Sequence, residues 1–288
     1  MLKTGIHSVG YFGRHDLKKY NGEGFRKIKA HGYDCIDYSE LSSLQSPIYT
    51  FSSAEYKTYL TELGKTVRDA GLEISQMHGL WPTAGDTEAS GRAKNLDYFK
   101  KEIEGAAYLG CPKIVIHPCM AYGWAGGTRE QMFEVNVNLL STLLPYAKTA
   151  NVTLCLENMP FRKPSAFSAI QELKDILIAI NSPFVKACLD TGHLVAMGDS
   201  MYESICLLGE DLAALHVHDD VAGQDRHLLP FQGQNDWQGF IKGLRDIRFN
   251  GCISLETHIS LTTPQPMLEE MQISLAKLAR CFIDEIEK

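Results

Sequence analysis

Short apolar segments alternate with longer amphipathic segments along the whole chain, and this alternation restricts the fold more than any other feature. Their near-continuous hydrophobicity is typical of parallel strands that are covered on both faces. Eight such strands are predicted, at 3–8, 33–38, 72–78, 113–118, 152–158, 185–190, 212–218 and 252–258. Helical patterns accompany them at 22–31, 54–70, 95–109, 128–149, 167–181, 199–208, 236–247 and 267–286.

Eight alternating units predict a fold of the α/β class, a closed (β/α)8 TIM barrel built as one domain from residues 1–288. The chain of 288 residues matches a single barrel, which typically uses about 250 residues. An open, doubly wound sheet is the structural alternative. It is disfavoured because the sequence has no glycine-rich first strand-to-helix turn and because eight units are the number that closes a barrel.

The net charge and the cysteine residues limit the binding partners and the cellular compartment that we expect for this protein. The formal net charge is −7 and no polybasic run is present, so binding to nucleic acid is not favoured. The eight cysteines form no CxxC pair and fall mostly in apolar segments, which indicates reduced, buried thiols. Neither a signal-peptide core nor a membrane-spanning apolar run is recognisable. We expect a cytoplasmic protein that does not contact a membrane.

Polar side chains gather at the carboxyl ends of the predicted strands, which is where the active sites of such barrels lie. Six successive strands end in or next to Asp, Glu or His. These residues are His78, His117, Glu157 with Asn158, Asp190 with His193, His216 with His218, and Glu256 with His258. One polar strand end carries little information, but six at the same end predict a shared site.

The residue types in this set predict a divalent metal ion. Several carboxylates are very costly to bury together unless a cation or protons neutralise them. Glu157, Asp190, His216 and Glu256 offer three carboxylates and one imidazole. This mainly oxygen ligand set favours Mn²⁺, with Mg²⁺, Co²⁺ or Zn²⁺ as alternatives.

The chain resembles the xylose isomerase-like TIM-barrel superfamily, which includes sugar isomerases and epimerases, inosose dehydratases and endonuclease IV. The matching stretches are LCLENMP (154–160), CLDTGHL (188–194), LHVHDD (215–220), DRHLLPFQGQNDW (225–237) and GCISLETH (251–258). The N-terminal half matches mainly through His78 and His117. The resemblance implies that Glu157, Asp190, His216 and Glu256 hold the metal.

The resemblance also implies a reaction, a metal-dependent isomerisation or epimerisation of a ketose or a related polyol. In ketose 3-epimerases of this superfamily, two glutamates bind the metal and exchange protons with the substrate. Glu157 and Glu256 are expected to be this catalytic pair, acting while the metal stabilises the enediolate. His193 is expected to touch a substrate oxygen or a further metal ion.

Further residues are expected to contact the sugar. Trp81 and Trp124 could stack on a sugar face, and Arg226 could reach the substrate from a lid that carries Asp225 and His227. The full expected set is His78, His117, His193, His227, Arg226, Trp81 and Trp124. His7 ends the first strand, where a structural role is favoured. The last helix, 267–286, could serve a homo-oligomer.

Other functions compete with this hypothesis. Endonuclease IV, a zinc phosphodiesterase that acts on abasic DNA, has nine ligand positions, and each has a chemically matching residue here. Its additional ligands would be His78, His117, His193, Asp225 and His227. The acidic charge and the first strand, GIHSVG in place of that family's Gly-Ser-His signature, disfavour it. A dehydratase of the inosose type would share the same metal site, and a non-catalytic sugar-binding or metal-binding protein is the least favoured reading.

Overall fold

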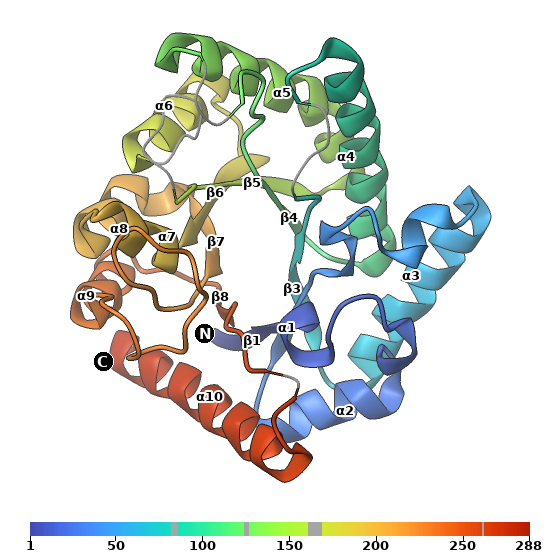
Figure 1. Ribbon diagram of the computed structural model, residues 1–288, viewed down its shortest axis with the longest axis vertical. Helices are drawn as coiled ribbons and strands as arrows, with labels where there is room; N and C mark the ends of the chain where they lie inside the picture. The colour runs from blue at the N-terminus through green and yellow to red at the C-terminus, as the bar shows by residue number, and fades with distance from the viewer. Residues whose placement is uncertain (82–85, 124–126, 161–168, 261) are drawn as a thin grey trace.

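The predicted barrel is confirmed by the computed structural model, which describes residues 1–81, 86–123, 127–160, 169–260 and 262–288. Eight parallel strands form one sheet in the order β7-β6-β5-β4-β3-β2-β1-β8 (Figure 1). The strands are β1 (Lys3–His7), β2 (Cys35–Tyr38), β3 (Glu73–His78), β4 (Lys113–Ile116), β5 (Thr153–Glu157), β6 (Val185–Asp190), β7 (Leu212–His216) and β8 (Cys252–Leu255).

The two ends of the sheet meet just beyond β7 and within β8. The Val217 N–H donates to the Ser254 carbonyl at 2.8 Å, and the Glu256 N–H donates to the Val217 carbonyl at 3.0 Å. These bonds join the last two strands, so the sheet closes on itself and the open-sheet alternative is wrong.

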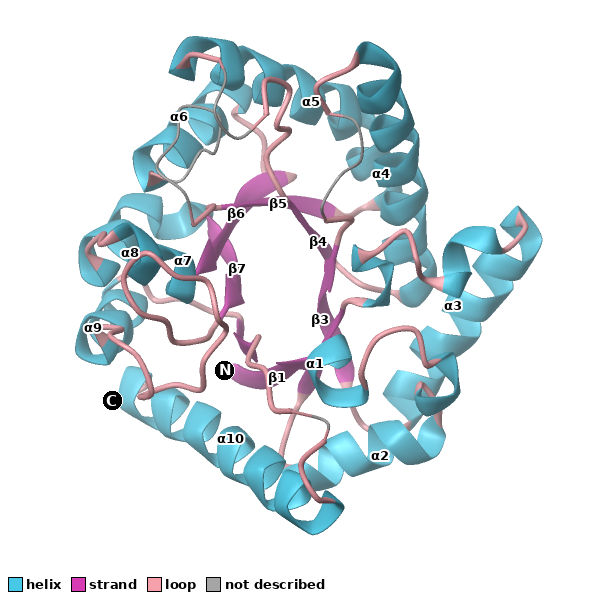
Figure 2. Cartoon of the chain, viewed as in Figure 1, coloured by secondary structure: helices cyan, strands magenta, loops and turns pink. Residues whose placement is uncertain are grey.

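Helices surround the strands as an outer ring (Figure 2). The longer ones are α2 (Gly22–His31), α3 (Ser53–Asp69), α4 (Ala89–Leu109), α5 (Arg129–Ala150), α6 (Ile170–Ile180), α8 (Met201–Leu208), α9 (Trp237–Asp246) and α10 (Gln265–Ile286). Two short helices that the sequence patterns did not predict follow strands directly, α1 (Ser8–Phe12) and α7 (Thr191–Met197). Within the described residues, no helix combines the length and apolarity that a membrane crossing requires.

Local sequence explains where helix α3 begins and ends. The Ser52 side chain accepts from the backbone N–H of Glu55, whose carboxylate accepts from Ser52 in return, a capping box. Leu60 and Val67 are fully buried against the barrel. Gly71 follows the last turn at φ 78°, a conformation that favours glycine.

Two irregularities in strand pairing set which side chains point into the barrel. Between β2 and β3 the register shifts so that Asp37 pairs with Gln76, leaving Ser75 as an extra residue. Between β6 and β7 the shift brings Asp190 opposite His216. Bulges of this kind re-aim side chains next to functional sites.

Candidate metal and substrate site

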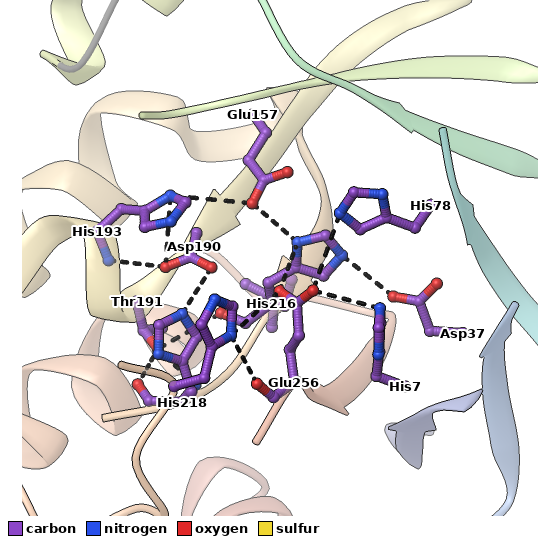
Figure 3. Close-up of polar contacts among 12 residues, drawn as sticks. His7, Asp37, His78, Glu157, Asp190, Thr191, His193, His216, His218 and Glu256 are labelled. Carbon is purple, nitrogen blue, oxygen red and sulfur yellow. Dashed lines mark hydrogen bonds and ion pairs between the residues drawn. The ribbon is translucent and has the colours of Figure 1, made fainter. Parts of the chain in front are cut away.

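Four side chains from the last four strands converge at the carboxyl end of the barrel. Glu157 ends β5, Asp190 ends β6, His216 ends β7, and Glu256 follows β8. Each offers one ligand atom, and these atoms all lie within 4.8 Å of one another. All four residues are buried, and Figure 3 shows them pointing toward a common centre. The donor set and its spacing therefore fit a single divalent cation.

His216 lies at the centre of this group, with both ring nitrogens facing carboxylates. Its Nδ1 lies 2.9 Å from Glu157 Oε1 and 3.1 Å from Glu256 Oε2. Its Nε2 lies 3.1 Å from Asp37 Oδ2 (Figure 3). The ring is therefore oriented from both sides by buried negative groups.

Asp190 is held by the residues that follow it. Its Oδ1 accepts from the backbone N–H of His193 at 2.7 Å and so caps helix α7, while its Oδ2 lies 2.8 Å from His218 Nε2. Gly192 lies against the His218 ring, and a β-carbon there would lie 2.0 Å from His218 Cε1. The segment Asp190-Thr191-Gly192-His193 thus supplies the Asp190 carboxylate and the backbone N–H that donates to it. Gly192 also leaves the space that the His218 ring needs to reach Asp190.

Each of the two glutamates has a second oxygen that faces other histidines. Glu157 Oε2 lies 3.1 Å from His117 Nε2. Glu256 Oε1 lies 3.3 Å from His7 Nε2 and 3.8 Å from His78 Nε2. Both glutamates thus present one oxygen to His216 and the other to the lining of the cavity.

Burial and neighbouring charges give the three carboxyl groups of the site different pKa values. Burial, together with the carboxylates of Glu157 and Asp190, raises the pKa of Glu256 to about 8. Burial also opposes ionisation of Glu157, but His216 and His117 hold its pKa well below the usual range. The pKa of Asp190 is likewise lowered, against burial, by His193 and His218. Burial beside two other carboxylates therefore favours the protonated form of Glu256, whereas nearby histidines favour the ionised forms of Glu157 and Asp190.

The histidines divide by pKa into two kinds. Burial lowers the pKa of His117 to about 3, and burial together with His218 lowers that of His227 to about 3. Burial also lowers the pKa of His193, but Asp190 and Asp225 outweigh it and raise the value to about 10. Neutral imidazoles offer a free nitrogen to a ligand, whereas a protonated one donates only.

A cavity of about 220 Å³ opens above the four residues, with room for a small polar molecule. Most residues expected to contact a sugar line it: His78, His117, His193, His227 and Trp81, together with Asp225. The Trp81 ring stacks on His117 with centroids 4.5 Å apart, so it forms one wall. Arg226 is exposed and is not among the residues that line this cavity, so its contact with a substrate stays a prediction. Trp124 lies outside the described residues.

The residues considered as additional metal ligands also gather around the four. One group joins His193, His218, Asp225 and His227, and another joins His78, His117 and Glu157. In each group the candidate ligand atoms lie within 4.8 Å of one another. The site thus offers more ligand atoms than one ion requires.

Several lining or buried residues were not assigned a catalytic, metal-binding or substrate-binding role from the sequence. His7, Arg14, Ser42, Met159, Pro160 and His258 line the cavity, and Asp37 and His218 lie beneath it. His7 was expected to be structural, but its ring reaches Glu256. The available signal for His218 was the alternation His-Val-His that begins at the last residue of β7. For Asp37 it was an Asp near the end of β2.

The chain belongs to the xylose isomerase-like TIM barrel family, whose model matches residues 25–278. The match covers strands β2 to β8 and all four central residues.

Individual relatives are distant. The chain is 26% identical over 263 residues to D-psicose 3-epimerase of Enterocloster bolteae, which covers 85% of this chain and 77% of that protein. It is 29% identical over 164 residues to a probable endonuclease 4 of Mesomycoplasma hyopneumoniae, covering 53% of this chain and 55% of the relative. The chain spans just over half the length of this endonuclease relative and of two other relatives, which are uncharacterised proteins.

Solved structures agree on the fold. A D-psicose 3-epimerase determined in the presence of D-fructose superposes with a TM-score of 0.78 at 18% identity, covering 97% of this chain and 99% of that one. The IolI protein with a bound zinc atom gives a TM-score of 0.75 at 20% identity, covering 99% of this chain and 98% of the other.

Proposed function

We propose that this protein is a divalent-cation-dependent sugar epimerase or isomerase that acts on a ketose. The observation that carries the proposal is the paired geometry of Glu157 and Glu256. Each has one oxygen near His216 Nδ1 and its second oxygen beside a histidine that lines the cavity, with Glu157 at the end of β5 and Glu256 just after β8. The similarity to D-psicose 3-epimerases over most of the chain supports a ketose as substrate.

The chemistry requires removal of a proton from a carbon next to a carbonyl, which a carboxylate cannot do unaided. A divalent cation held by Glu157, Asp190, His216 and Glu256 would supply electrostatic stabilisation of the negative charge that develops on the substrate. One glutamate then takes the proton from one face of the carbon, and the other delivers a proton to the opposite face. The histidines beside the second glutamate oxygens are His117, 3.1 Å from Glu157 Oε2, and His7, 3.3 Å from Glu256 Oε1.

The cavity walls would hold the sugar in place. Trp81 offers an apolar ring face to the carbon skeleton, and His193 and His227 offer ring nitrogens to hydroxyl groups. His193 is oriented by its Nδ1, which lies 2.7 Å from the Asn158 carbonyl, and its Nε2 lies 3.7 Å from Asp225 Oδ1 on the cavity side.

The test is a screen of ketoses in D₂O with Mn²⁺, Mg²⁺, Co²⁺ or Zn²⁺, in which product and deuterium incorporation are followed by NMR. We expect deuterium at the carbon next to the carbonyl. Glu157→Gln and Glu256→Gln should each lower turnover by at least about 10²-fold, the lower end of what a positioned acid or base contributes. Glu102→Gln, which changes a buried glutamate outside the site, is the matched control. Near wild-type turnover of either site variant with metal bound would contradict the two-glutamate mechanism.

A phosphodiesterase acting on abasic DNA is the second candidate, because the additional His and Asp clusters could hold more than one ion. Strand scission of an abasic duplex without exchange at a ketose would favour it. Loss of water from a keto-inositol, in the same screen, would identify a dehydratase instead.

A further inference from the structure

Asp37, at the end of β2, lies directly behind the four central residues and has no part in the chemistry described above. It is fully buried, and its Oδ2 is 3.1 Å from His216 Nε2 (Figure 3). The same oxygen accepts from the Gln76 side-chain amide at 2.9 Å. Its Oδ1 has no hydrogen-bond partner among the described residues.

We propose that Asp37 is a positioning residue that selects which nitrogen of His216 binds the cation, an inference that rests on the proposed cation site. A neutral imidazole carries one N–H and one free lone pair, on different nitrogens. With the N–H on Nε2 and donated to Asp37, the lone pair is on Nδ1. That nitrogen faces the space between Glu157 and Glu256.

The pairing of strands β2 and β3 supports this positioning role for Asp37. The register shift at Ile36/Asp37 places Asp37 opposite Gln76, and the Gln76 amide also reaches across the barrel to the Leu215 carbonyl at 3.1 Å. Asp37 is therefore held by a side chain that is itself anchored next to His216. A carboxylate is costly to bury at this depth, and partners such as these offset that cost. Carboxylates that accept from a ligating histidine fix its tautomer and raise its basicity.

The first experiment compares Asp37→Asn with wild type by calorimetric titration with Zn²⁺ and by the absorption spectrum of the Co²⁺-loaded protein. Asparagine keeps the shape but removes the charge, so we expect about 10- to 100-fold weaker Zn²⁺ binding. Ser254→Ala is the control, because Ser254 is buried in β8 and its hydroxyl has no described partner. Its affinity should equal that of wild type.

The second experiment needs no variant. In zinc-loaded wild-type protein with ¹⁵N-labelled histidine, NMR should show His216 with zinc on Nδ1 and a hydrogen-bonded proton on Nε2. Zinc on Nε2, or an unchanged affinity in Asp37→Asn with only a lower melting temperature, would overturn the proposal. Failure of wild-type protein to bind any of the ions would instead refute the proposed function.

Discussion

At the scale of single residues, the segment Asp190-Thr191-Gly192-His193 shows how closely the site depends on local sequence. Asp190 is both a ligand candidate and the cap of helix α7, and Thr191 exchanges hydrogen bonds with the backbone of His218. Gly192 is needed because the His218 ring occupies the place of a side chain. His218 in turn holds the second oxygen of Asp190. The four positions therefore act as one unit.

Gly192→Ala tests this unit. The added methyl group would collide with the His218 ring, so the ring must move away from Asp190. We expect a loss of about 1–3 kcal/mol in the free energy of unfolding, as for other overpacked sites, together with weaker Zn²⁺ binding. Urea denaturation and calorimetry measure the two effects. Gly22→Ala is the control, since the nearest atom there is the flexible end of Arg26, at 3.1 Å. Equal stability of both variants would show that the close approach is unimportant.

At the scale of elements, the order and type of the strands and long helices could be predicted from the sequence, because each covered strand is apolar and each outer helix has one apolar face. The register shifts could not be predicted. Asp37 and Ser75 lie in apolar segments, and nothing in the sequence shows which residue of a strand is left without a partner. The position of Asp37 beside His216 depends on that shift and was therefore not predicted. The direction of the Arg226 side chain could not be predicted either, because sequence spacing does not show which way a loop side chain points.

Helix α4 carries a buried carboxyl group, Glu102, which is not one of the residues that line the cavity. Glu102 Oε2 accepts from the backbone N–H of Leu80 at 3.3 Å, next to Trp81, and Glu102 Oε1 contacts the Tyr49 hydroxyl. That hydroxyl lies 2.8 Å from the Leu41 carbonyl. Burial raises the pKa of Glu102 to about 8. A neutral carboxyl group donating to Tyr49, which donates to Leu41, satisfies this chain of contacts.

Glu102 should make stability depend on pH. Because its pKa is raised in the folded protein, the stabilisation of its protonated form is fully present below the unfolded value near 4.5 and is lost as pH rises through about 8. At about 1.4 kcal/mol per pKa unit, the loss is on the order of a few kcal/mol. Glu102→Gln keeps the donor and the acceptor without the ionisation. Denaturation at pH 5 to 9 should therefore show a smaller decline for this variant, and parallel curves would contradict the assignment.

At the scale of the whole molecule, barrel closure brings together groups that are far apart in the sequence. His7 and Asp37 from the first two strands meet Glu256 and His216 from the last two. The described part of the chain thus concentrates buried carboxylates at one end of the barrel, around a space where their ligand atoms lie within 4.8 Å. Such a cluster opposes folding unless protons or a cation neutralise it.

Cation binding should therefore stabilise the entire barrel. At a free concentration 100 times the dissociation constant, one bound ion adds about 2.7 kcal/mol to the free energy of unfolding. For a domain of this size that corresponds to a rise in Tm of roughly 4–5 °C. The measurement is calorimetry of chelator-treated protein before and after addition of Mn²⁺, Mg²⁺, Co²⁺ or Zn²⁺. Glu256→Gln, which removes one charged ligand, should lose more than half of the shift, whereas Glu102→Gln, equally buried but outside the site, should keep it. Equal shifts in both variants would mean that the ions stabilise the protein from some other place.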